Sequence, residues 1–217
     1  MYLGIHATVG LAIAALCAWA FSAIADEFPE NGAMARVDLA VTNWLQLHGT
    51  ERGETIFWWV SLLGAPVLIG TVCVVTGVFV FRRDWRNLAV LATTCAGGAI
   101  LNAVLKLAFH RERPTFAAEF VTGSWSFPSG HAMDSLIVYG LFSYWIGRAF
   151  PTSRVLVRIG ATVLVLAIGF ARIYLGVHYL SDVLAGYCAG FVWLVVSITA
   201  YQFAERRGIG PARAGGS

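Results

Sequence analysis

The chain has 217 residues, of which 58% are hydrophobic and only 12% are charged. This composition excludes an ordinary soluble domain, in which about a quarter of the residues are charged. The formal net charge is +3, and arginine carries almost all of the basic charge because Lys106 is the only lysine. So small a basic excess in so apolar a chain does not indicate nucleic-acid binding and more often reflects orientation in a bilayer.

Six apolar segments are long enough to cross a membrane, which takes about 20 mostly apolar residues. The segments cover residues 5–24, 57–81, 87–109, 131–150, 156–174 and 183–203. We therefore predict an all-α polytopic membrane protein with six transmembrane helices. No linker or internal repeat divides the chain, so we expect a single domain over residues 1–205, followed by a short cytoplasmic tail over residues 206–217. The first segment lacks the basic start of a signal peptide, which favours an uncleaved helix.

The stretch between the first two spans, residues 25–56, is acidic and amphipathic. Its apolar residues recur at helical spacing: Val37, Leu39, Val41, Trp44 and Leu45. We predict that this stretch forms a short interfacial helix that lies flat on the membrane surface.

The distribution of arginine predicts the orientation of the chain. If the N-terminus is cytoplasmic, the inner loops and the tail carry nine basic and two acidic residues, whereas residues 25–56 carry two basic and six acidic ones. This is the positive-inside pattern, so we expect a multi-pass protein of the cytoplasmic (inner or plasma) membrane with both termini in the cytoplasm. Odd spans then end, and even spans begin, on the periplasmic or extracellular side. Four basic residues break the pattern and fall on that side: Lys106, Arg111, Arg113 and Arg172.

Three short motifs with unusual polar residues fall on this outer side. In the first, Lys106 is followed after six residues by Arg113 and Pro114. Seven residues make nearly two helical turns, so both cations can share one face. Taken alone, the motif also fits a lysine that reaches the interface and arginines that contact lipid headgroups.

The second motif is Pro128-Ser129-Gly130-His131, directly before the fourth span. Ser129 is a natural N-cap, and Gly130 would let an anion approach the backbone closely. The free N–H groups and the dipole of a helix start favour a bound phosphate. An ordinary cap and turn is the alternative, but it leaves His131 unexplained.

The third motif contains Arg172, His178 and Asp182. His178 and Asp182 are four residues apart and share a face if the segment is helical. A carboxylate that accepts a hydrogen bond from one ring nitrogen fixes the tautomer, so the lone pair of the other nitrogen can attack. An ion pair at a helix start is the alternative. Together, however, the motifs predict a phosphate site with a nucleophilic histidine and a second histidine as general acid.

The three motifs jointly resemble those of the type 2 phosphatidic acid phosphatase superfamily, which includes membrane lipid phosphatases, glucose-6-phosphatases and vanadium-dependent haloperoxidases. The resemblance implies that His178 attacks phosphorus and forms a phosphohistidine, that Asp182 orients its ring, and that His131 protonates the leaving oxygen and then activates water. It also implies a set of phosphate-binding residues: Lys106, Arg113, Ser129, Gly130 and Arg172. One departure is Ala171, where the third motif of the superfamily usually has serine, so one hydroxyl near the phosphate is missing.

The resemblance implies an integral-membrane, metal-independent lipid phosphatase whose partners are a phosphorylated lipid and the bilayer. Three cations can neutralise the phosphate, and no carboxylate cluster is available to hold a metal, so we expect no metal and no cofactor. Undecaprenyl diphosphate is the first substrate choice, by analogy with compact bacterial members. Phosphatidylglycerophosphate or phosphatidate, and a lipid phosphotransferase, are the alternatives. A transporter is disfavoured because its polar residues would lie near the midplane rather than at helix ends, and a haloperoxidase because the chain is short and membrane-embedded. The oligomeric state stays open.

Overall fold

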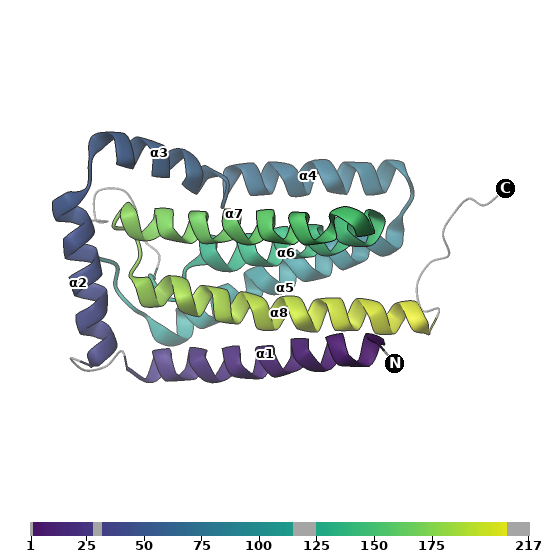
Figure 1. Cartoon of the computed structure of the whole chain (residues 1–217), viewed down its shortest axis with the longest axis horizontal. Coiled ribbons are helices and arrows are strands. Elements are labelled where there is room, and N and C mark those ends of the chain that lie inside the picture. Colours follow the sequence, from purple (N-terminus) through teal and green to yellow (C-terminus); the bar gives the residue numbers. More distant parts are fainter. Residues whose placement is uncertain (1, 28–31, 115–124, 208–217) are drawn as a thin grey trace.

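The computed structural model describes residues 2–27, 32–114 and 125–207, and in these ranges the chain is helical, without a strand. The predicted tail therefore falls outside the described residues from residue 208 onward. The helices are α1 (Tyr2–Asp26), α2 (Ala33–His48), α3 (Glu51–Leu62), α4 (Pro66–Phe81), α5 (Trp85–Phe109), α6 (Gly130–Ala149), α7 (Arg154–Tyr174) and α8 (Leu180–Arg206), with a 3₁₀ turn at Pro151–Ser153. All except α2 run roughly along one direction, and α2 lies across one end of the bundle (Figure 1).

Five segments of the described chain are long and apolar enough to cross a membrane. They are Thr8–Asp26, Glu51–Phe81, Trp85–Phe109, Pro151–Tyr174 and Leu180–Arg206. The prediction of an all-α membrane protein is thus confirmed, but the count of six spans is not. The remaining predicted span, 131–150, does form a helix of similar length, α6. This helix is less apolar because it includes His131, Asp134 and Arg148.

The predicted span 57–81 is interrupted, and it starts earlier than expected. Helix α3 begins at Glu51, and the side chain of Thr50 caps it by accepting from the N–H of Gly53. The helix stops before Gly64, and α4 begins at Pro66. Proline suits this position because it has no N–H, and the N–H groups of a first turn have no partner within the helix. The hydroxyl of Tyr139 donates to the carbonyl of Leu63 at 2.7 Å, and this hydrogen bond connects the break between α3 and α4 to α6.

A helix does form within residues 25–56, as predicted, namely α2, but its apolar residues do not share one face. Leu45 is buried against the bundle together with the polar residues Asp38 and Thr42. Val37 and Trp44 are exposed. Helix α2 therefore turns a partly polar face to the protein and leaves large apolar side chains on its outside.

Helices α6 and α8 approach each other closely through two glycines spaced four residues apart on α8. A β-carbon at Gly186 would lie 2.7 Å from the carbonyl oxygen of Ser129, and one at Gly190 would lie 3.0 Å from that of Met133. Small residues at this spacing let the backbones of membrane helices touch. The contact brings the start of α6 to the start of α8, where the N–H of Ser129 donates to the carbonyl of Asp182 at 2.9 Å.

Candidate active site

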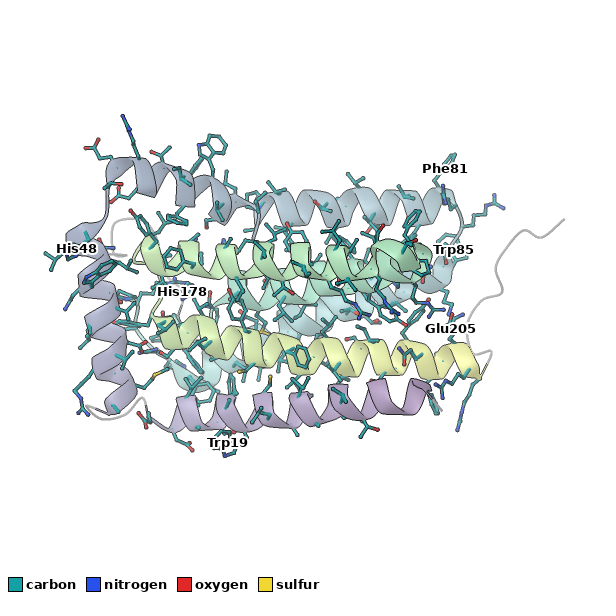
Figure 2. The ribbon with its side chains drawn as sticks, in the orientation of Figure 1. Trp19, His48, Phe81, Trp85, His178 and Glu205 are labelled. Atoms are coloured by element: carbon teal, nitrogen blue, oxygen red, sulfur yellow. The ribbon has the colours of Figure 1, made fainter. Side chains whose placement is uncertain are left out.

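The structure brings the three motifs together at the end of the bundle that α2 covers. Lys106 lies in the last turn of α5, and Arg172 lies in the last turn of α7. His131 is the second residue of α6, and Asp182 lies in the first turn of α8. His178 lies in the short connection between α7 and α8, and Figure 2 shows it beside α2.

His178 and Asp182 form a buried pair, with 2% and 0% of their side chains exposed. The ring Nδ1 of His178 lies 3.4 Å from Oδ2 of Asp182. The same oxygen accepts from the hydroxyl of Ser126 at 2.5 Å and from the N–H of Tyr179 at 2.9 Å. The hydroxyl of Ser126 also lies 3.3 Å from Nδ1 of His178. The carboxylate is therefore fixed by the start of α8 and can hold the ring in one orientation.

The other ring nitrogen of His178 faces a cation. Nη1 of Arg113 lies 3.2 Å from Nε2 of His178 and donates to the carbonyl of Val177 at 2.8 Å. A guanidinium can only donate, so Nε2 accepts, and we infer that the ring proton is on Nδ1, facing Asp182. This is the tautomer in which the lone pair of Nε2 points toward Arg113, one of the predicted phosphate-binding cations.

Burial favours the neutral form of this ring. Desolvation is the main cause that lowers the pKa of His178, to about 4. Asp182 raises this pKa, but by less, and the nearby charges of Arg113 and Arg172 lower it further. Burial also lowers the pKa of Arg113, although Asp182 opposes the change. At neutral pH the imidazole is therefore unprotonated at Nε2, as a nucleophile requires.

Two of the predicted cations share one acceptor. Nζ of Lys106 donates to the carbonyl oxygen of Trp125 at 2.5 Å, and Nη2 of Arg113 donates to the same oxygen at 3.4 Å. The side chains from the two ends of the first motif thus converge on one point beside His178, although not on one helix face, because α5 ends at Phe109 and Arg113 lies beyond it.

The third cation, Arg172, has both a partner and an unused donor. Its Nη1 donates to the hydroxyl of Ser61 on α3 at 2.7 Å. Its Nε is buried and, among the described residues, has no hydrogen-bond partner. The hydroxyl of Ser129 is likewise buried without a partner in the part of the chain that the structure describes. Buried polar atoms are normally satisfied, so these two fit a site that a phosphate oxygen completes.

The expected capping role of Ser129 is wrong in one respect. Ser129 does occupy the N-cap position of α6, but its hydroxyl makes no capping hydrogen bond. Gly130 is the first residue of α6, and the first N–H groups of a helix have no partner within the helix. The start of α6 therefore keeps donors available, together with the hydroxyl of Ser129.

Several side chains of the site were not singled out from the sequence. The contacts just described add Ser61 and Ser126, and two further residues, Asp38 and Arg111, contact Asp182 or its neighbours. Arg111 was noticed only as one of the basic residues on the outer side. No group of three or more His, Cys, Asp or Glu side chains that could hold a metal ion occurs among the described residues.

Comparisons with known proteins agree with this geometry. Residues 87–206, more than half of the chain, match the sequence profile of the PAP2 superfamily. Phosphatidylglycerophosphatase B of Bacillus subtilis (strain 168) is 36% identical over 146 residues, which cover 66% of this chain and 67% of that protein. A crystal structure of a transmembrane PAP2-type phosphatidylglycerolphosphate phosphatase from Bacillus subtilis matches 89% of this chain and 96% of its own, with a TM-score of 0.78 and 28% identity.

The chain therefore belongs to the PAP2 superfamily, and the resemblance found in its motifs is confirmed. It is a membrane lipid phosphatase, that is, an enzyme that hydrolyses phosphate esters.

Proposed function

We propose that the enzyme hydrolyses phosphatidylglycerophosphate through a phosphohistidine on His178. The observation that carries this proposal is the position of the His178 ring, with Asp182 at Nδ1 and Arg113 at Nε2. Both named relatives act on this phospholipid according to their descriptions. Undecaprenyl diphosphate, the first choice from the sequence, stays a prediction that the same assay tests.

The first chemical step forms the bond from Nε2 of His178 to phosphorus and breaks the bond from phosphorus to the lipid oxygen. As the phosphate enters, the N–H of Arg113 moves from Nε2 to a phosphate oxygen, which frees the lone pair. Asp182 stabilises the charge that develops on the ring. Lys106 and Arg172 neutralise the other phosphate oxygens, because phosphoryl transfer depends mostly on positioning and on charge stabilisation.

The second histidine of the site, His131, transfers protons in both steps. His131 donates a proton to the leaving lipid oxygen in the first step. It then takes a proton from water, which attacks phosphorus of the phosphohistidine and releases inorganic phosphate. The hydroxyl of Ser129 and the N–H of Gly130 bind phosphate oxygens at the start of α6. No metal takes part in either step.

We also propose that α6 crosses the membrane and so completes the predicted set of six spans, of which it is the fourth along the chain. Residues 1–205 then form one domain. Helix α6 runs from the α2 end of the bundle to the opposite end, antiparallel to α5 and α7 (Figure 1). Helix α1 begins and α8 ends at that opposite end, which requires an even number of crossings (Figure 1). With the arginine-rich loops in the cytoplasm, both termini are cytoplasmic, α2 lies at the outer interface, and the site opens to the periplasmic or extracellular side of the inner or plasma membrane.

A phosphate-release panel tests the substrate and the nucleophile together. Purified protein is given phosphatidylglycerophosphate, phosphatidate and undecaprenyl diphosphate, and we expect the highest kcat/KM for the first. His178→Ala should abolish release, whereas His48→Ala, at an exposed histidine of α2, should not. Substantial activity of folded His178→Ala would refute the nucleophile assignment, and a preference for the diphosphate would refute the proposed substrate.

A labelled substrate distinguishes hydrolysis from phosphotransfer. We expect the label to appear as inorganic phosphate and, after rapid quenching, as base-stable and acid-labile phosphohistidine. Label that appears instead on a second lipid would show a phosphotransferase.

A further inference from the structure

Helix α2 carries a carboxylate that is buried at the end of the bundle. The side chain of Asp38 is only 1% exposed. Its Oδ1 accepts from the N–H of Ser181 at 2.9 Å, and its Oδ2 accepts from the hydroxyl of Ser181 at 2.5 Å. Ser181 directly precedes Asp182, so α2 is bonded to the first turn of the helix that carries the partner of His178.

Arg111 joins the two carboxylates. Its Nη2 donates to Oδ2 of Asp38 at 2.7 Å, and its Nη1 donates to Oδ1 of Asp182 at 2.6 Å and to the hydroxyl of Ser181 at 2.7 Å. The guanidinium also lies over the ring of Tyr179, 4.2 Å from its centroid. A planar fork with several fixed donors suits such a bridge, and a lysine could not reproduce it.

The two carboxylate oxygens of Asp182 have different hydrogen-bond partners. Arg111 holds Oδ1, which leaves Oδ2 for Nδ1 of His178 and for the hydroxyl of Ser126. A rotation of the carboxylate would break the bonds of both oxygens. The position of the His178 ring therefore depends on the bond between Arg111 and Oδ1 as well as on the bond between the N–H of Tyr179 and Oδ2.

The charges of the bridge also favour the reaction. One guanidinium faces two carboxylates, so the cluster of Asp38, Arg111 and Asp182 has a formal charge of −1. Attack on phosphorus gives the ring of His178 a positive charge, which this excess negative charge stabilises in a buried setting. Without Asp38, more of the charge of Arg111 would act on Asp182, which would weaken the support that Asp182 gives to the ring.

We propose that Asp38 and Arg111 are positioning residues for the nucleophile, so that helix α2 is part of the catalytic machinery. This inference rests on the proposed role of His178. The exposed residues of α2 include Val37, Trp44 and Leu47, which suit a lipid surface. The bridge thus connects the seating of α2 on the membrane to the geometry of His178.

The test compares Asp38→Asn with Ser181→Ala and with two controls on the same side of the molecule. Asp38→Asn removes the charge at constant size, and Ser181→Ala removes only the hydroxyl shared by Asp38 and Arg111. Leu45→Ala weakens the packing of α2 on the bundle without touching the bridge, and Glu54→Gln removes an exposed carboxylate of α3. Each variant is assayed for kcat, KM, the rate of phosphohistidine formation and thermal stability.

We expect kcat and the rate of phosphohistidine formation to fall by about tenfold or more in Asp38→Asn and by roughly threefold in Ser181→Ala, with KM nearly unchanged, because small displacements of reacting groups are costly. Leu45→Ala should melt earlier but keep its kcat, and Glu54→Gln should match the wild type. If Asp38→Asn is not recovered folded, Ser181→Ala decides alone.

Two results would overturn the inference. One is an unchanged kcat in Ser181→Ala or in folded Asp38→Asn. The other is a loss of kcat in Leu45→Ala that equals the loss in Asp38→Asn at equal loss of stability, which would mean that α2 only stabilises the fold. His178→Ala is run beside them, because its residual activity would refute the nucleophile itself and not merely its positioning.

Discussion

Gly64 lies in the break between α3 and α4, and a methyl group at this position would meet two side chains. The added β-carbon would lie 2.6 Å from Cγ2 of Ile168, and 3.1 Å and 3.4 Å from Cδ2 and Cβ of His131. Ordinary van der Waals contact begins at 3.4 Å, so the first contact is 0.8 Å too short and the second is 0.3 Å too short. Ile168 is fully buried, so it has little room to move. The substitution Gly64→Ala must therefore displace the ring of His131, the backbone at the break, or both.

The size of the effect follows from these distances. Overpacking of a dense interior costs about 1–3 kcal/mol of stability. A displacement of a catalytic group by about 1 Å can lower the rate on the order of a hundredfold. Because the break can take up part of the misfit, we expect kcat of Gly64→Ala to fall by roughly 10- to 100-fold, with a smaller change in KM.

Phosphate release and thermal unfolding of the purified variant measure both effects. The matched control is Gly70→Ala on α4, where the added carbon meets nothing within 4 Å apart from its own helix backbone and chain neighbours. We expect this control to keep the wild-type kcat. A Gly64→Ala enzyme with wild-type kcat and wild-type stability would refute the reasoning, because it would mean that neither the break nor His131 is constrained by this contact.

Three further outcomes are expected. Arg113→Lys should lower kcat/KM by about tenfold or more, because one ammonium cannot contact Val177, Trp125 and the phosphate together; a kcat/KM within twofold of the wild type would contradict the role of the guanidinium. The pKa of His178 is about 4 in the fold and has its ordinary value near 6.5 in the unfolded chain, so the unfolded chain takes up the proton first. Wild-type stability relative to His178→Asn should therefore be constant above pH 6.5 and decline as the pH falls from 6.5 toward 4, and thermal melts that show the opposite slope would exclude a buried neutral ring. Activity should persist in EDTA and be inhibited by vanadate, which mimics the trigonal-bipyramidal phosphoryl group; loss of activity on chelation would require a different mechanism.

Much of the site follows from local patterns. His178 and Asp182 are close because they flank the start of one helix. Lys106 lies in the last turn of α5, and Arg113 follows shortly after the end of this helix. This short separation lets both side chains reach the carbonyl oxygen of Trp125. These relations depend on short sequence separations, which spacing rules describe well.

Other features depend on distant parts of the chain and left no local signal. Ser61 contacts Arg172 across 111 positions, and Asp38 contacts Ser181 across 143. The break at Pro66 was also missed, because membrane helices tolerate proline and glycine within apolar runs.

Helix α6 illustrates why hydropathy alone gives an incomplete count. Met133, Ile137 and Leu141 are fully or almost fully buried, as are the polar residues Ser135 and Ser129 beside them. A helix surrounded by protein needs fewer apolar residues than one that faces lipid, so its sequence is less apolar than those of its neighbours.

This property of α6 has a consequence for biogenesis. A segment that is only weakly apolar partitions poorly from the translocation channel into lipid by itself. Its neighbours α5, α7 and α8 cover it with protein, and the glycines of α8 allow a close approach of the two backbones. We expect α6 to leave the channel late, after or together with these helices, so that the helix that carries His131 settles late and the enzyme becomes active only when the nascent chain is nearly complete.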